Sequence, residues 1–329
     1  MNGLAKISLL LVILLVSLSA YLRLAHSGMG CADWPECYGR IGQAVTLSLP
    51  VESGNAYQQM VEQANQPMAW ATPLHRLVAS VLGLLIVFLT FFALRQKRQR
   101  IITLTLLGLT VFLAILGIRS GSLHNPAVVM GNLAGGFSML GLLGWMVFRS
   151  DTDKRPNEPG SPGAARLMAV IAIVLLSLQI ILGGLTSANF AATSCQTLPD
   201  CHGSWLPGSS LLTAFDLSRR HEVTTMGQAI GGKERLAIHK AHRIGAIITL
   251  AMVLFTALAA LRSGPRYRMT AIIIMMLISL EFCVGITAIL TSLPIGLAVA
   301  HNWLAGLILL ALLKLAAMTL NVHKNGLSP

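Results

Sequence analysis

The chain of 329 residues is 54% hydrophobic and only 11% charged, and its mean hydropathy is +0.71. Soluble domains carry charged residues at about a quarter of their positions, so this composition excludes an ordinary soluble protein and indicates a polytopic membrane protein. The formal net charge of +12 does not indicate nucleic-acid binding, because Lys and Arg stand in short runs between apolar segments and act as topology signals.

Eight apolar stretches are long enough to cross the roughly 30 Å hydrocarbon core of a bilayer. They cover residues 7–24, 76–94, 101–118, 127–148, 167–187, 238–261, 269–291 and 297–320. The first stretch is short and ends in small residues, so a cleaved signal peptide is its alternative interpretation. The sequence therefore predicts an all-α integral membrane protein with eight transmembrane helices.

Basic residues predict the orientation of these spans. Lys and Arg cluster in the loops after the second, fourth and sixth spans, and such loops face the cytoplasm. Both termini are then cytoplasmic, and two long loops, 25–73 and 188–237, lie on the outer side of the cell membrane. The polar, Pro/Gly-rich stretch 151–165 is predicted to link an N-terminal half, 1–150, to a C-terminal half, 166–329.

The two halves share a sequence pattern. Each long outer loop contains C-x3-P-[DE]-C-x-G, and the span that follows each loop opens with His-Arg. The matching residues are Cys31, Cys37, His75 and Arg76 in the first half and Cys195, Cys201, His242 and Arg243 in the second. Chance rarely repeats such a pattern at corresponding points, so we predict two pseudo-symmetric four-helix bundles.

The paired cysteines lie in loops predicted to face an oxidising compartment, which favours one disulfide in each loop. Zinc binding is the alternative, although Cys-x5-Cys is not the usual spacing of zinc ligands. The spacing does not separate a structural pair from a redox-active one. Cys283, inside the span 269–291, is interpreted as a small buried apolar residue.

Three histidines, His75, His242 and His301, lie near the outer ends of predicted spans. An imidazole at this depth usually faces the bundle interior and has a function, and an interhelical hydrogen bond is the simpler alternative. His242 and His301 are predicted to face each other at matching heights, which is the geometry of axial haem ligation. Arg76 and Arg243 could pair with haem propionates or act as interfacial anchors.

The first half does not repeat the second histidine. When Val-Val-Met-Gly-Asn132 is laid on Leu-Ala-Val-Ala-His301, Asn132 takes the position of the ligand. Asparagine is a poor ligand for haem iron. His124, in the short loop nearby, lies roughly two helical turns away and could substitute only if that loop folds inward.

Together these features resemble the haem A synthase family, which converts haem O to haem A for terminal oxidases. The matching segments are Tyr21 to Cys37, Leu74 to Arg76, Leu178 to Asn189, Cys195 to Gly203, His239 to Arg243, and Leu297 to Asn302. The resemblance implies a b-type haem held between His242 and His301, and haem O as a substrate bound through His75. It also implies oxidation of one ring methyl group of haem O to a formyl group.

The resemblance further implies that Cys31 and Cys37 serve haem transfer or activity, and that Cys195 and Cys201 are structural. Membrane lipid surrounds such a protein, haem O synthase is a candidate supplier of substrate, and an electron partner is needed. A homo-oligomer is compatible with the sequence, and no nucleic-acid partner is expected.

Two residues depart from the family pattern. Thr72 stands where the family has the glutamate of E-x-x-H-R, and Asn132 stands where it has a histidine. The sequence therefore leaves two hypotheses: a haem A synthase with a variant substrate site, or a catalytically silent member that acts as a b-type electron-transfer protein. A transporter built on the internal repeat is less favoured, because transporter repeats are commonly inverted.

Overall fold

The computed structural model describes residues 2–24, 71–119, 126–152, 163–189, 191–192, 194–195, 197–208, 210–217 and 232–320. Within these ranges the regular structure is helical: α1 (Asn2–Leu24), α4 (Ala71–Arg95), α5 (Arg100–Arg119), α6 (Pro126–Thr152), α7 (Gly163–Ala188), α8 (Leu211–Ala214), α9 (Gly232–Arg262), α10 (Pro265–Leu290) and α11 (Ile295–Leu320). Eight of these helices are long and apolar enough to cross a membrane. The all-α membrane fold predicted from the sequence is thereby confirmed.

The helices extend beyond the predicted apolar stretches. The largest difference is at α9, which begins at Gly232 and includes a charged first turn with Glu234 before the apolar run. Hydropathy marks only the hydrocarbon-crossing part, whereas main-chain hydrogen bonds continue the helix into the polar zone. The short helix α8 was not predicted, since four residues carry no periodic pattern.

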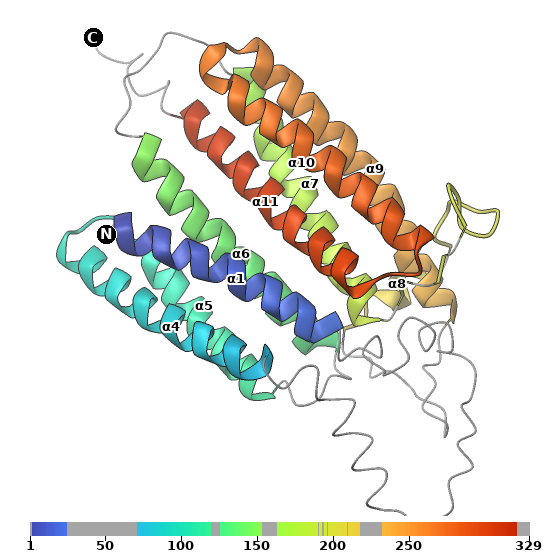
Figure 1. Ribbon diagram of the computed structural model, residues 1–329, viewed down its shortest axis with the longest axis horizontal. Coiled ribbons are helices and arrows are strands. Elements are labelled where there is room, and N and C mark those ends of the chain that lie inside the picture. Colours follow the sequence, from blue (N-terminus) through green and yellow to red (C-terminus); the bar gives the residue numbers. More distant parts are fainter. Residues whose placement is uncertain are drawn as a thin grey trace, which may run out of the picture.

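The long helices form two groups of four with the same order of neighbours (Figure 1). In the first group α1 and α5 each pack against both α4 and α6, and in the second α7 and α10 each pack against both α9 and α11. The helices α4 and α6, and likewise α9 and α11, therefore occupy diagonal positions. The diagonal helices carry the candidate site residues: α4 and α6 carry His75 and Asn132, and α9 and α11 carry His242 and His301.

The two groups meet along a seam in which α6 contacts α11 and α7, and α1 contacts α11. Glycines bring α6 and α11 close together: Leu310 packs on Gly144, and a Cβ atom added to Gly306 would lie 3.2 Å from Leu140. Arg23 at the end of α1 donates a hydrogen bond to Asn302 of α11 at 3.2 Å. The seam therefore joins the halves by both apolar packing and a polar contact.

The first helix is packed into this structure. Val12 and Val16 of α1 are buried in the large core cluster, together with residues of α6 and α11. At the start of α1, Lys6 lies 3.0 Å from Asp151, and Ser150 donates a hydrogen bond to Asn2 at 2.7 Å. These contacts make α1 part of the packed helical assembly.

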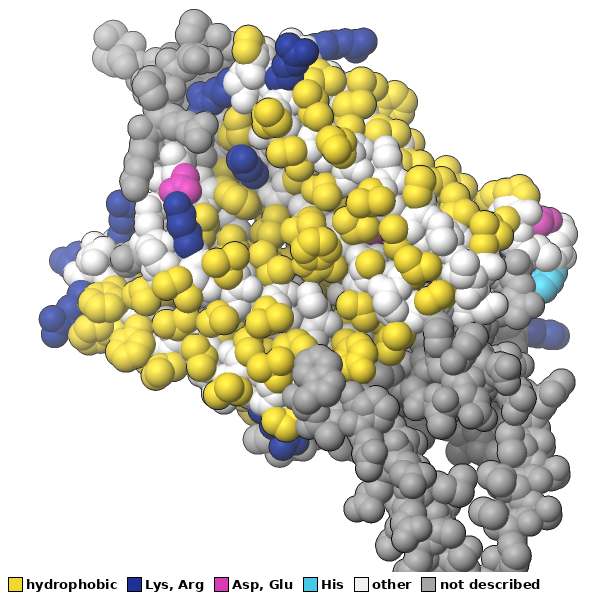
Figure 2. All heavy atoms as spheres, in the orientation of Figure 1, with side chains coloured by type: hydrophobic (Ala, Val, Ile, Leu, Met, Phe, Trp, Pro, Cys, Tyr) yellow, Lys and Arg dark blue, Asp and Glu magenta, His cyan; other side chains and the backbone are white. Residues whose placement is uncertain are grey.

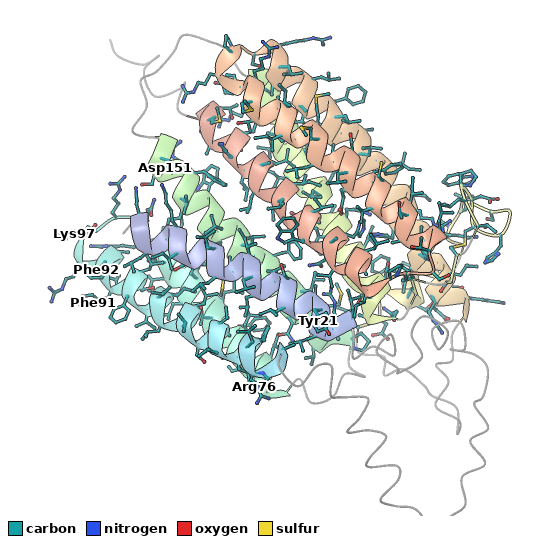
Figure 3. All side chains as sticks on the ribbon, in the orientation of Figure 1. Tyr21, Arg76, Phe91, Phe92, Lys97 and Asp151 are labelled. Carbon is teal, nitrogen blue, oxygen red and sulfur yellow. A yellow bond between two sulfur atoms is a disulfide. The ribbon has the colours of Figure 1, made fainter. Side chains whose placement is uncertain are left out.

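The flanks of the molecule are apolar and one end is basic. Large hydrophobic side chains cover the visible face in Figure 2, and most of the visible Lys and Arg side chains gather at the end where α1 begins and α11 ends. Figure 3 places Lys97 and Asp151 at this end, and Tyr21 and Arg76 at the opposite end. Cys283 corrects one prediction: it is exposed, because α10 packs mainly on α9 and α11 among the described helices and turns its remaining face outward.

Candidate functional site

The structure brings two of the predicted site histidines together. His242 of α9 and His301 of α11 lie with their ring centroids 6.4 Å apart and their planes at 80°. A metal ion bound by one nitrogen of each ring, at about 2 Å per bond, would hold the centroids roughly 6 Å apart. The pair is therefore spaced to hold a metal between the two rings.

A glycine lies against each of these rings. A Cβ atom added to Gly183 of α7 would stand 3.2 Å from Cε1 of His242, and one added to Gly285 of α10 would stand 3.1 Å from Cε1 of His301. Any larger residue at either position would have to displace the imidazole. The two glycines thus leave the rings room at the positions from which they face each other.

A polar side chain also lies beside the Nδ1 atom of each ring. Nε2 of Gln179 is 3.0 Å from Nδ1 of His242 and donates a hydrogen bond to the main-chain oxygen of His242 at 2.9 Å. Oε1 of Glu281 is 3.2 Å from Nδ1 of His301, and the Glu281 side chain is only 12% exposed. Sequence reasoning missed both residues, although the shared spacing Gln179-x3-Gly183 and Glu281-x3-Gly285 was a signal in the sequence.

Arg243, next to His242, holds the cysteine loop. Its guanidinium donates hydrogen bonds to the main-chain oxygens of Cys195 and Thr197, both at 2.6 Å, and of Asp200 at 2.9 Å. Cys195 and Cys201 are joined by a disulfide with Cα atoms 5.2 Å apart, as predicted. Pairing of Arg243 with a haem propionate stays a prediction, and it would compete with these three hydrogen bonds.

The equivalent residues of the first half are less completely described. His75, in the second turn of α4, and Asn132 of α6 are both half-buried, and Arg76 is exposed at the end of α4 (Figure 3). Thr72 lies in the first turn of α4, but its side chain is outside the described residues. The predictions for Cys31, Cys37 and His124 also lie outside the described ranges.

Leucines of α5 pack on two glycines near Asn132 in α6. A Cβ atom added to Gly131 would meet Leu116 at 2.7 Å, and one added to Gly135 would meet Leu113 at 2.6 Å. The glycines on either side of Asn132 are therefore covered by aliphatic side chains of α5.

Within the described ranges, no group of three or more His, Cys, Asp or Glu side chains could hold a metal ion. A closed structural metal centre of the zinc type needs about four such ligands. Two imidazoles alone suit a metal whose other ligands come from a macrocycle.

The chain is similar to known proteins along nearly its whole length. Residues 3–313 match the COX15-CtaA family, described as cytochrome oxidase assembly protein. The chain is 32% identical to the haem A synthase of Shewanella oneidensis over 321 residues, covering 96% of this chain and 95% of the relative. It is 26% identical to that of Sinorhizobium medicae, covering 92% and 84% of the two chains, and 24% identical to that of Neorickettsia sennetsu, covering 92% and 94%.

The matches extend over all eight membrane-spanning helices and both halves of the molecule. They include α9 and α11, which supply the facing imidazoles. The chain belongs to the COX15-CtaA family of cytochrome oxidase assembly proteins, together with the haem A synthases.

Proposed function

We propose that this protein is a membrane oxidoreductase of haem A biosynthesis, which oxidises a ring methyl group of haem O to the formyl group of haem A. The facing imidazoles of His242 and His301 carry this proposal, in a chain that matches haem A synthases along nearly its whole length. The conversion adds one oxygen atom and withdraws electrons from the methyl carbon. If water supplies the oxygen atom, a separate acceptor must take the electrons and the protons are released. If dioxygen supplies it, dioxygen is itself the oxidant and its second oxygen atom leaves as water.

In this proposal His242 and His301 would hold a b-type haem in the C-terminal half. The 6.4 Å centroid spacing, the two glycines and the buried polar groups beside the rings support this assignment. When bound, such a haem supplies one-electron transfer. Gln179 and Glu281 would orient the two histidines.

The N-terminal half is the substrate site in this proposal. His75 is its one histidine on the helix equivalent to α9, and we assign it as the ligand that holds the iron of haem O. Asn132 offers a carboxamide on the diagonal helix, which binds iron poorly. A substrate held by one good ligand is retained less tightly than a prosthetic group held by two.

The proposed orientation has both termini in the cytoplasm and the Cys195–Cys201 loop on the outer side of the cell membrane. The basic end visible in Figure 2 supports it, because Lys and Arg favour the cytoplasmic side. Haem O would arrive from a haem O synthase, and an electron partner would act on the C-terminal haem.

The test is expression of this protein together with a haem O synthase in a host that lacks its own haem A synthase. Extracted haems are separated by chromatography and identified by mass. We expect haem A, or the intermediate that carries a hydroxymethyl group. Accumulation of haem O beside a bound b-type haem would instead identify a silent member of the family, and the proposed oxidation would be wrong.

A further inference from the structure

The helices that precede the two histidine helices carry a matched pair of polar residues. Gln179 lies four residues before Gly183 on α7, which packs on α9, and Glu281 lies four residues before Gly285 on α10, which packs on α11. In each case the glycine lies against an imidazole and the polar side chain lies beside its Nδ1 atom. Each histidine is thus held by two residues of its neighbouring helix.

Placing the acidic side chain of Glu281 in this apolar helix has a cost in free energy. Glu281 lies inside α10, a helix long and apolar enough to cross a membrane, and acidic side chains in such segments are rare and usually functional. Its Oε1 atom lies 3.2 Å from Nδ1 of His301, within ion-pair distance, whereas neither its Oε2 atom nor that Nδ1 atom makes a hydrogen bond among the described residues. The contact with His301 is therefore the main compensation for burying this carboxylate.

We propose that Gln179 and Glu281 are positioning residues for the His242–His301 pair, and that Glu281 makes His301 the more strongly electron-donating ligand. This inference rests on the haem-binding role proposed above for the two histidines. Neither residue binds the iron itself. Glu281 acts through the imidazole of His301, and Gln179 acts through its hydrogen bond to the main-chain oxygen of His242.

The chemistry of imidazole explains the division of roles. An imidazole that binds a metal through Nε2 carries its hydrogen on Nδ1, so an acceptor beside Nδ1 fixes the orientation of the ring. The carboxylate of Glu281 is such an acceptor; it also raises the basicity of the ligand, and its negative charge favours oxidised over reduced iron. The amide nitrogen of Gln179, which lies 3.0 Å from Nδ1 of His242, is only a donor. Gln179 therefore positions His242 through its hydrogen bond to the main-chain oxygen of that residue, without adding charge.

The N-terminal half lacks this polar pair. Gln179 stands 16 residues before Cys195, and the residue 16 before Cys31 is Leu15. Glu281 and Thr110 stand at the same distance from the ends of α10 at Leu290 and α5 at Arg119, and the Thr110 hydroxyl donates to Leu106 of its own helix. The polar supports are therefore present in the half that has two histidines and absent from the half that has one.

The test uses the purified full-length protein with its bound haem, and its first variant is Glu281→Gln. This change keeps the size of the side chain and removes its charge. We expect a retained b-type absorption spectrum, a higher midpoint potential in redox titration and altered g-values in the low-spin electron paramagnetic resonance signal. Gln179→Glu should shift the midpoint potential downward, because it places a carboxylate beside the second ligand.

Removal of the side chain tests positioning. Glu281→Ala and Gln179→Ala should each weaken haem retention by about tenfold or more, the usual effect of losing a partner of a metal-bound histidine. Asp151→Asn is the matched control, since it removes one carboxylate at the opposite end of the molecule and should change neither the potential nor the haem content. If an alanine variant fails to fold, the two isosteric changes decide the question.

The results separate this inference from the function on which it rests. A wild-type spectrum that survives in both His242→Ala and His301→Ala would refute the histidine-ligated haem itself. A spectrum that depends on both histidines, with the same potential and g-values in Glu281→Gln as in wild type, would overturn only the role of Glu281. Unchanged haem retention in both alanine variants would overturn the positioning role.

Discussion

The two halves of this protein share one helix arrangement and differ in what fills it. In the C-terminal half two imidazoles face each other at 6.4 Å, each with a polar partner and a glycine. In the N-terminal half the equivalent positions hold His75 and Asn132, and leucines of α5 cover the glycines beside Asn132. The difference suits the proposed roles, because a prosthetic haem must stay bound whereas a substrate must enter and leave.

The largest expected effect is the loss of the C-terminal haem. His301→Ala or His242→Ala removes an axial ligand, and we expect the b-type absorption of the purified protein to disappear or to shift strongly. His202→Ala is the control, since His202 is exposed on the disulfide loop and should leave the spectrum intact. Wild-type spectra in both ligand variants would contradict the proposal that the C-terminal half holds a haem through these two histidines.

The complementary change is His75→Ala in the N-terminal half. We expect bound haem b to persist while haem A formation falls by about a hundredfold, because displacement of a substrate by about 1 Å can already cost that much in rate. Spectroscopy of the purified protein and analysis of haems extracted from the host measure the two effects. Loss of the b-type spectrum in this variant would contradict the assignment of the two haems to separate halves.

A smaller effect is expected at the glycines beside the imidazoles. In Gly285→Ala the new Cβ atom would lie 3.1 Å from the His301 ring, so the ring must shift and the haem-to-protein ratio should fall. Gly108→Ala is the control, since its Cβ atom would have nothing within 4 Å, and such a change inside a helix should stabilise it by about 0.5–1 kcal/mol. Equal haem content in the two variants would show that Gly285 does not set the position of the ring.

The smallest effect is expected at Arg243. A lysine ammonium cannot reproduce the planar guanidinium that reaches three main-chain oxygens. Arg243→Lys should therefore lower the stability of the folded cysteine loop by about 1–2 kcal/mol. Faster reduction of the Cys195–Cys201 disulfide by a mild thiol should report this loosening. Arg262→Lys, at the exposed end of α9, is the matched control. If the disulfide is reduced at the wild-type rate in both variants, the three hydrogen bonds of Arg243 contribute little to the stability of the loop.

The fold followed from the sequence because hydrophobic length alone sets the number of spans. Hydropathy could not give the polar first turn of α9 or the outward face of α10 that exposes Cys283, because both depend on hydrogen bonding and packing. The histidine pair was predictable because His242 and His301 both lie near the outer ends of predicted spans, which places them at matching heights. The sequence did not predict the contacts of Gln179 and Glu281 with the histidines, since these depend on how neighbouring helices pack. It did not predict the hydrogen bonds of Arg243 either, since these depend on the folded conformation of the cysteine loop.

The glycine seam between α6 and α11 has a consequence for electron flow. The helix that carries Asn132 packs directly against the helix that carries His301, with Leu310 on Gly144 and Leu140 beside Gly306. If haem occupies both halves, the route between the two irons runs through adjoining helices of one chain and crosses no lipid. An electron withdrawn from the substrate side could then reach the second haem inside the protein, and a bulky residue at Gly144 or Gly306 would lengthen that path.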